Sequence, residues 1–189
     1  MTRALLLGLP LFLSLSLPLL ADGPVVSGVP VGGRPGPYSF LVATGPQGGQ
    51  PTCYICEQLD KPTAVVFARS LTDPLGKLLA RLDAEAVVRK GQGFKVWMTL
   101  LGPNADLDGL AKWAQRQGIK DSPVGAFEDA DGPPAYKIHK DADVTVMLFV
   151  NQKVVANFAF RAGELNEKQV AAVMAAVPQL FEKPLLEKK

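Results

Sequence analysis

The sequence predicts an α/β domain in which a central mixed β-sheet is flanked by helices, and two observations lead to this prediction. Short apolar runs typical of buried strands alternate with longer segments whose apolar residues recur at helical spacing. Near the C-terminus, the tight-turn signal Asn151-Gln152 joins two strand-like runs that precede a last helix. The resulting order, β-β-α-β-α-β-β-β-α, is typical of a sheet that carries helices on both faces.

The first half of the domain is expected to hold two strands, a return toward the cysteines and the first long helix. Residues 38–44 predict a short strand, and the glycine-rich turn signals at 45–49 return the chain. Residues 63–68 form an unbroken run of β-branched and apolar residues, as in a fully buried strand. Asp73 can cap the helix that follows, with Pro74 in its first position.

The second half continues the alternation, and caps and turns bound its elements. The acidic stretch between two of its strands lacks the spacing of a calcium loop, so we interpret it as a solvated loop. In chain order, we expect an alternating strand at 94–100, a helix capped by Asn104 that stops at Gly118, a short strand at 124–127, the acidic loop at 129–134, a buried strand at 144–150, its hairpin partner at 153–160 and a helix capped by Asn166.

The N-terminus has the pattern of a secretory signal peptide. Arg3 precedes an apolar run at residues 4–20, and Ala21 supplies the small residue of a cleavage site. An uncleaved membrane anchor is the alternative. Pro10 and Pro18 interrupt the run, which is marginal in length for a membrane span, so export with cleavage is the favoured interpretation.

Three parts of the chain follow from this interpretation: a signal peptide at 1–21, an extended segment rich in Gly and Pro at 22–37, and one domain at 38–189. The chain has 20 Lys and Arg residues against 18 Asp and Glu, a balance that gives no electrostatic case for binding nucleic acid or an anionic lipid surface. Export to the periplasm or the extracellular space predicts an oxidising compartment, in which two cysteines form a disulfide.

Four stretches of the chain carry a resemblance to a known superfamily. They are VPVGGRPGPYSFLVATG at 29–45, AVVFAR at 64–69, TDPLGKLLARL at 72–82 and AYKIHKDADVTVMLFVNQKVVANFAF at 135–160. In these stretches the chain resembles the thioredoxin-like superfamily, and the first of them is similar to the approach of the redoxin and peroxiredoxin branch. The resemblance covers roughly residues 30 to 177 and implies a thioredoxin-like fold with an N-terminal strand or hairpin extension.

The usual redox site of that superfamily is missing from its expected place. Thioredoxins carry C-G-P-C where the central strand meets its helix, and the matching residues 72–75 read T-D-P-L. A peroxiredoxin's attacking cysteine would also lie near Thr72, whose hydroxyl cannot do thiolate chemistry. The superfamily's cis-proline is replaced too, since residues 143–145 read D-V-T. We expect a trans bond before Val144, because a non-proline cis bond costs about 3 kcal/mol.

Cys53 and Cys56, the only cysteines of the chain, are spaced as C-x-x-C ahead of the strand at 63–68. As a displaced redox pair they would exchange disulfides with a protein partner that the sequence does not name, with Cys53 as the attacking sulfur and Cys56 resolving the mixed disulfide. As a structural disulfide they would close a ring so short that it stabilises the fold by only about 2 kcal/mol. No helix that could lower a thiol pKa is evident after the pair.

Two further interpretations remain open. The protein could be a non-enzymatic binding module, with the disulfide as a clip and the surface around Thr72 and Val144 free for protein contact. Alternatively, Cys53, Cys56 and His139 could bind copper, since two thiolates and an imidazole suit that metal. His139 is more simply interpreted as a solvated loop residue, and no cofactor is predicted.

Overall fold

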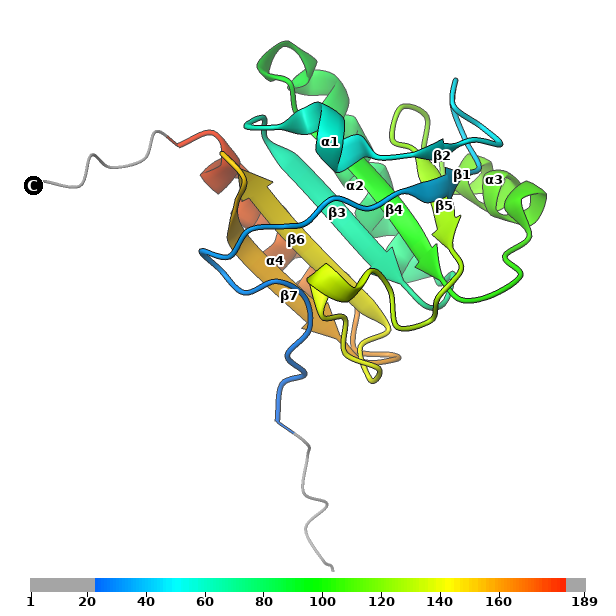
Figure 1. Cartoon of the computed structure of the whole chain (residues 1–189). Helices are drawn as coiled ribbons and strands as arrows, with labels where there is room; N and C mark the ends of the chain where they lie inside the picture. The colour runs from blue at the N-terminus through cyan, green and yellow to red at the C-terminus, as the bar shows by residue number, and fades with distance from the viewer. Residues whose placement is uncertain (1–22, 183–189) are drawn as a thin grey trace, which may run out of the picture.

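The central feature of the structure is a seven-stranded mixed sheet with the strand order β2-β1-β5-β4-β3-β6-β7 (Figure 1). The computed structural model describes residues 23–182, so the predicted signal peptide at 1–21 lies outside the described residues. The strands are β1 (Phe40–Val42), β2 (Pro51–Thr52), β3 (Thr63–Ala68), β4 (Lys95–Leu101), β5 (Val124–Phe127), β6 (Val144–Val150) and β7 (Lys153–Phe160). The helices are α1 (Tyr54–Gln58), α2 (Asp73–Val88), α3 (Leu107–Arg116) and α4 (Glu167–Ala176).

The sheet is mixed, as predicted. β3, β4 and β5 run parallel to one another, while β6 is antiparallel to β3 and β7 is antiparallel to β6. The hairpin of β1 and β2 extends the sheet beyond β5, which confirms the N-terminal hairpin extension. β1 is shorter than the predicted strand at 38–44. Within the described part of the chain, no helix is both long and apolar enough to span a membrane.

Two of the predicted helix caps are wrong by one or two residues. The side chain of Thr72, not Asp73, caps α2, because its Oγ1 accepts a hydrogen bond of 3.3 Å from the backbone N–H of Leu75. Asp106 caps α3 in place of Asn104 and accepts a bond of 3.0 Å from a backbone N–H one turn on. Asn166 caps α4 as predicted.

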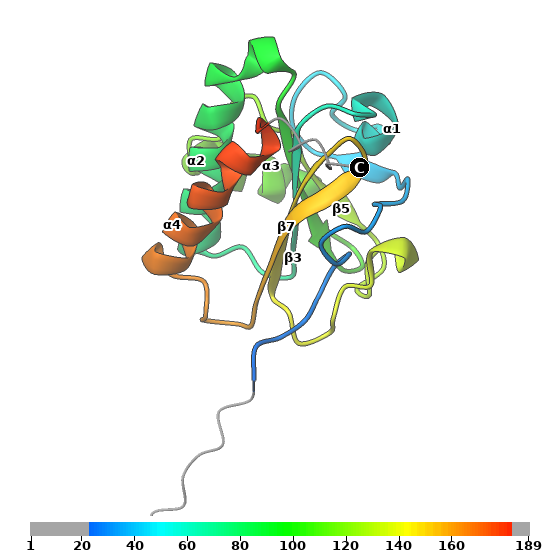
Figure 2. The same ribbon diagram turned by 90° about the vertical axis from the view of Figure 1, so that its left-hand side faces the viewer.

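The two faces of the sheet are covered unequally. α2, α3 and α4 share one apolar core with one face of the strands, and Figure 2 shows α2 and α4 together on that side. The helical elements on the opposite face are short, namely the five-residue α1 and a 3-10 turn at Pro134–Tyr136. Helices therefore lie on both faces, as expected, but the long helices all lie on one of them.

The extended N-terminal segment covers much of the opposite face, where Figure 1 shows it crossing in front of the strands. Val25 and Val29 are buried against the sheet. Backbone hydrogen bonds of 2.8 and 2.9 Å tie Gly32 and Gly33 to Val154 of β7. Through these contacts, residues of the segment form part of the folded unit.

The second core, under this segment, is aromatic and holds a buried hydrogen-bonded chain. The indole N–H of Trp97 donates to the hydroxyl of Tyr38 at 2.8 Å, and that hydroxyl lies 2.9 Å from the hydroxyl of Thr99. Burial raises the pKa of Tyr38 far above the ordinary value, although its two hydrogen bonds act in the opposite direction. The neutral hydroxyl can therefore satisfy two polar groups inside the core.

Candidate active site: a groove beside the Cys53–Cys56 disulfide

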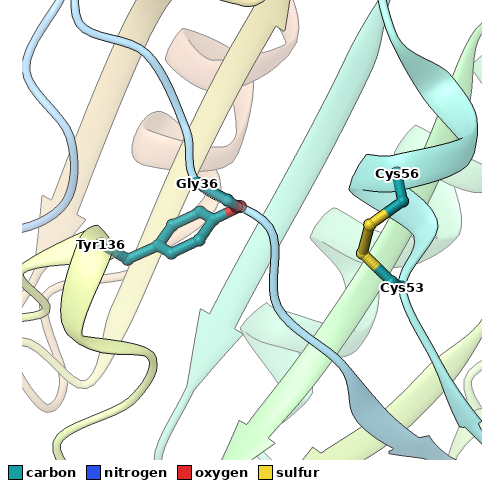
Figure 3. Close-up of a disulfide and its surroundings, with 4 residues drawn as sticks. All are labelled: Gly36, Cys53, Cys56 and Tyr136. Atoms are coloured by element: carbon teal, nitrogen blue, oxygen red, sulfur yellow. A yellow bond between two sulfur atoms is a disulfide. The ribbon is translucent and has the colours of Figure 1, made fainter.

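Cys53 and Cys56 form a disulfide at the start of α1 (Figure 3). Cys53 is the residue that precedes the first turn of the helix, and its carbonyl accepts a bond of 3.1 Å from the N–H of Cys56. The expectation that no helix follows the pair is therefore wrong. Five residues are too few to show helical periodicity, so the sequence pattern does not predict α1.

α1 is anchored to the protein by Tyr54, which points into the aromatic core. Its side chain is 1% exposed, and its ring centroid lies 5.7 Å from those of Trp97 and Phe40. The ammonium group of Lys95 lies 4.4 Å from the ring of Tyr54 and pairs with Glu57 at 3.1 Å. With Tyr54 held inward, Cys53 is half-buried and Cys56 is exposed to solvent.

A groove of about 370 Å³ runs between α1 and the extended N-terminal segment. Phe149 of β6, which is 1% exposed, lines it together with side chains of both walls. Cys56 belongs to the wall formed by α1, so the disulfide borders this space rather than the protein interior. We call it the disulfide groove, and its lining residues are Arg34, Pro35, Gly36, Pro37, Ile55, Cys56, Leu59, Phe149 and Gln152.

Tyr136 holds the opposite wall of the groove in place. Its hydroxyl donates a bond of 2.8 Å to the carbonyl oxygen of Gly36, and Figure 3 shows Gly36 between Tyr136 and the disulfide. Only glycine fits there, because a Cβ at position 36 would lie 2.8 Å from the Cβ of Ala135. Burial, followed by the proximity of Tyr38, raises the pKa of Tyr136 well above the ordinary value, so the hydroxyl remains a donor.

A side-chain amide links the N-terminal wall of the groove to the residues that follow α1. Nε of Arg34 donates to Oε1 of Gln152 at 2.9 Å, and Nε2 of Gln152 donates to Oδ1 of Asp60 at the same distance. The backbone N–H of Asn151 also donates to the carbonyl of Asp60, at 3.0 Å. Asn151 and Gln152 have φ values of 52° and 58°, as the predicted tight turn requires.

The arrangement of these elements is similar to that of several solved structures. A candidate protein disulfide isomerase from Bacteroides thetaiotaomicron matches with a TM-score of 0.63 at 17% identity, over 82% of this chain and 94% of that one. A candidate thiol:disulfide interchange protein, DsbE from Chlorobium tepidum, matches with a TM-score of 0.55 at 18% identity, over 79% and 99%. The bacterioferritin comigratory protein of Xanthomonas campestris matches with a TM-score of 0.52 at 14% identity, over 77% and 92%.

These three structures are thioredoxin-fold proteins, and the peroxiredoxin-related one belongs to the redoxin branch. This chain has a thioredoxin-like fold. No family model matches the chain, and no curated protein matches it in sequence. The fold thus confirms the resemblance on which the sequence interpretation depends.

The usual thioredoxin-like site, where β3 ends, is occupied here by structural hydrogen bonds. The hydroxyl of Ser70 donates to Asp143 at 2.8 Å, and Nε of Arg69 donates to the carbonyl of Ala142 at 3.0 Å. The peptide bond before Val144 is trans, as expected. Val144 is only 1% exposed, so it cannot belong to the binding surface that the sequence suggested around Thr72.

His139 does not join the two cysteines. It lies exposed in the loop between the 3-10 turn and β6, where its Nδ1 accepts a bond of 3.2 Å from the N–H of Asp141. Among residues 23–182, no group of three or more His, Cys, Asp or Glu side chains is placed to hold a metal ion. The structure therefore does not assemble the copper site that Cys53, Cys56 and His139 would form.

Several groove residues were not among the sequence candidates. Arg34 lies in the Gly- and Pro-rich stretch, which offers no pattern that ties it to the cysteines. Phe149 follows the strand pattern of β6, and Gln152 follows the turn pattern. Leu59, directly after α1, has a φ of 49° and is 62% exposed, features that appear only once the backbone is placed.

Proposed function

We propose that this thioredoxin-like protein carries out thiol–disulfide exchange through the Cys53–Cys56 pair. The observation that supports the proposal is the position of Cys56, an exposed residue on the wall of a groove large enough to take a side chain of a partner. A four-residue ring contributes only about 2 kcal/mol to stability. Accessibility to a second protein is thus the more distinctive property of this disulfide.

The exchange proceeds in two steps. A thiolate of the partner attacks Sγ of Cys56, the bond to Cys53 breaks, and Cys53 leaves as a thiolate that takes up a proton. The second thiolate of the partner then attacks the partner's own sulfur in the mixed disulfide, and Cys56 leaves and is protonated. The partner loses two electrons and becomes a disulfide, while this protein gains them as two thiols, with both protons supplied by the partner.

In the reverse direction Cys56 attacks a partner disulfide and Cys53 resolves the mixed disulfide. Cys56 carries the mixed disulfide in both directions because it is the exposed member of the pair. This assignment exchanges the roles that the sequence suggested for Cys53 and Cys56. The exposure difference, which arises from the inward-facing Tyr54 between them, is the reason for the change.

The reduction potential of the Cys53–Cys56 couple tests the proposal. Equilibration of the purified protein with glutathione buffers should give a value above about −250 mV, as in labile, exchanging disulfides. A value below roughly −300 mV would mark a structural disulfide and overturn the proposal. The structural alternative then becomes the better account of the pair.

Trapping tests the assignment of the two sulfurs. With insulin as a disulfide substrate, Cys53→Ser should accumulate a mixed disulfide through Cys56, whereas Cys56→Ser should react more slowly through the half-buried Cys53. Cys53→Ser/Cys56→Ser is the matched control, which retains the fold at a cost of about 2 kcal/mol and traps nothing. Faster trapping by Cys56→Ser would restore Cys53 as the attacking sulfur.

We also propose that the exchange takes place after export, in the periplasm or outside the cell. The N-terminal pattern at residues 1–21 and the disulfide support this location. N-terminal sequencing of protein isolated from the cell exterior or the periplasm should begin just after Ala21. A mature protein that still begins at Met1 in the cytosolic fraction would contradict it.

A further inference from the structure

We infer that the disulfide groove selects partner segments that carry an acidic residue and an apolar residue beside the reacting cysteine. The inference rests on the proposed function, because it names the partner chemistry that the same site would accept. It depends on two features of the groove that the exchange chemistry itself does not require. These are a positive charge that no carboxylate of the described residues contacts directly and an exposed apolar rim.

Arg34 supplies the charge. It is the single charged residue among the groove lining, which is otherwise apolar or neutral. Within residues 23–182, no carboxylate lies within 4.0 Å of its guanidinium group. The acidic residues of the α1 region have other direct partners, since Glu57 pairs with Lys95 and Asp60 accepts from Gln152, whose amide stands between that carboxylate and Arg34.

The neutral amide of Gln152 orients Arg34 without cancelling its charge. Gln152 accepts from Nε and NH2 of Arg34, which uses two of the five N–H donors that a guanidinium group carries. The remaining donors can bind a carboxylate from outside, and charge-assisted bonds of this kind are about twice as strong as neutral ones. A carboxylate of the partner is therefore the chemically matched ligand for this end of the groove.

Leu59 supplies the apolar rim. Its side chain is 62% exposed although its backbone has a φ of 49°, a conformation that costs a leucine free energy and gains it no burial. Ile55 and Phe149 line the groove beside it, and Cys56 lies on the same wall. An apolar side chain next to the partner's cysteine would cover this surface while its sulfur meets Cys56.

The test compares short peptides that share one cysteine with a neighbouring leucine and differ only in a Glu or a Lys nearby. The measured quantity is the rate at which each peptide thiol opens the disulfide of the full-length oxidised protein. Dividing each rate by that of the same peptide with an uncharged disulfide, oxidised 2-mercaptoethanol, removes differences in thiol reactivity. At low salt, the Glu peptide should react about fivefold faster, as expected for an exposed charge pair, and the preference should vanish near 1 M salt.

Charge variants identify the residue responsible. Arg34→Glu should invert the preference and Arg34→Gln should abolish it. Lys112→Glu, which makes the same change of charge on α3 on the opposite face, should leave it unchanged. Leu59→Asn, whose side chain tolerates positive φ, should reduce the advantage of leucine over serine beside the peptide cysteine. Equal rates for the Glu and Lys peptides with the wild-type protein would overturn the inference while leaving exchange intact. Failure of both peptides and of glutathione to open the disulfide would overturn the proposed function as well.

Discussion

The hydroxyl of Tyr136 and the carbonyl of Gly36, 100 residues apart in the chain, are joined by a partly buried hydrogen bond of 2.8 Å (Figure 3). The bond connects the loop that precedes β6 to the extended segment that forms one wall of the disulfide groove. No other side-chain bond holds residues 35–37 in the described structure. Between the anchors at residues 32–34 and β1, this phenol is therefore the side-chain tie that positions the wall relative to the disulfide.

Tyr136→Phe should lower the free energy of unfolding by about 1 to 2 kcal/mol, because it removes one hydrogen bond and leaves a carbonyl unpaired. Urea denaturation measures the loss. Tyr54→Phe is the matched control, since its hydroxyl contacts only the side chain of Gln47 at 3.2 Å and its loss should cost less. An equal or larger loss in Tyr54→Phe would contradict the importance assigned to the bond with Gly36.

Stability should fall at alkaline pH because the pKa values of Tyr38, Tyr54 and Tyr136 are all raised, chiefly by burial. In the unfolded chain tyrosine ionises at its ordinary pKa of 10.0, while in the folded protein these groups keep their protons. Above pH 10 the native state thus binds more protons than the unfolded state, so the free energy of unfolding decreases as pH rises.

The free energy of unfolding should fall by about 1.4 kcal/mol per pH unit for each tyrosine that stays protonated in the folded protein. Below pH 10 the tyrosines should no longer contribute to this pH dependence. Urea denaturation at several alkaline pH values measures it, and phenolate absorbance of the native protein provides an independent check. Ionisation of all three tyrosines near pH 10 without unfolding would contradict the prediction.

Leu59→Gly should raise the free energy of unfolding by about 1 kcal/mol. Glycine adopts the φ of 49° without strain, and this gain exceeds the extra entropy of the unfolded chain. Because the leucine is 62% exposed, little burial is lost. Leu71→Gly, at a loop leucine that is 37% exposed and has an ordinary negative φ, is the control and should destabilise the protein. A loss of stability in Leu59→Gly as large as in the control would show that the backbone at Leu59 is not strained.

Asp83→Asn should destabilise the protein by about 2 kcal/mol. The carboxylate is 4% exposed and accepts three backbone N–H bonds of 2.6 to 3.0 Å from residues 120–122, which lead into β5. An asparagine offers only one acceptor oxygen and no charge, so at least one N–H loses its partner. Asp108→Asn, on the exposed surface of α3, should change stability by less than about 0.5 kcal/mol. Similar effects of the two substitutions in urea denaturation would contradict this account.

Local patterns predicted most of the fold. The unbroken apolar run at 63–68 and the paired runs on either side of Asn151-Gln152 became β3, β6 and β7, because strand burial and tight turns depend on residues that are close in sequence. The capping residues of α2 and α3 differ from the predicted ones by one or two positions, because Thr72 and Asp106 accept the capping hydrogen bonds.

Only part of the candidate site could be predicted from local sequence patterns. Predicted export to an oxidising compartment, with only two cysteines in the chain, led to the prediction of a disulfide, which the structure contains. Their different exposure follows from Tyr54, whose ring packs against residues that are distant in sequence. Arg34 lines the same groove as Cys56 because Tyr136 and β7 hold the N-terminal segment across the sheet.

The sequence by itself determined the order of strands and helices, the thioredoxin-like arrangement they form and the absence of cysteines at residues 72–75. Tertiary structure alone decided that the Gly- and Pro-rich segment packs on the sheet, that Cys56 is more exposed than Cys53, and that an arginine with no carboxylate in contact among the described residues lines the same groove. The physical reason is the range of the interactions. Periodicity and turn chemistry act between neighbours in the chain, whereas the groove is built by hydrogen bonds and aromatic contacts between residues tens of positions apart.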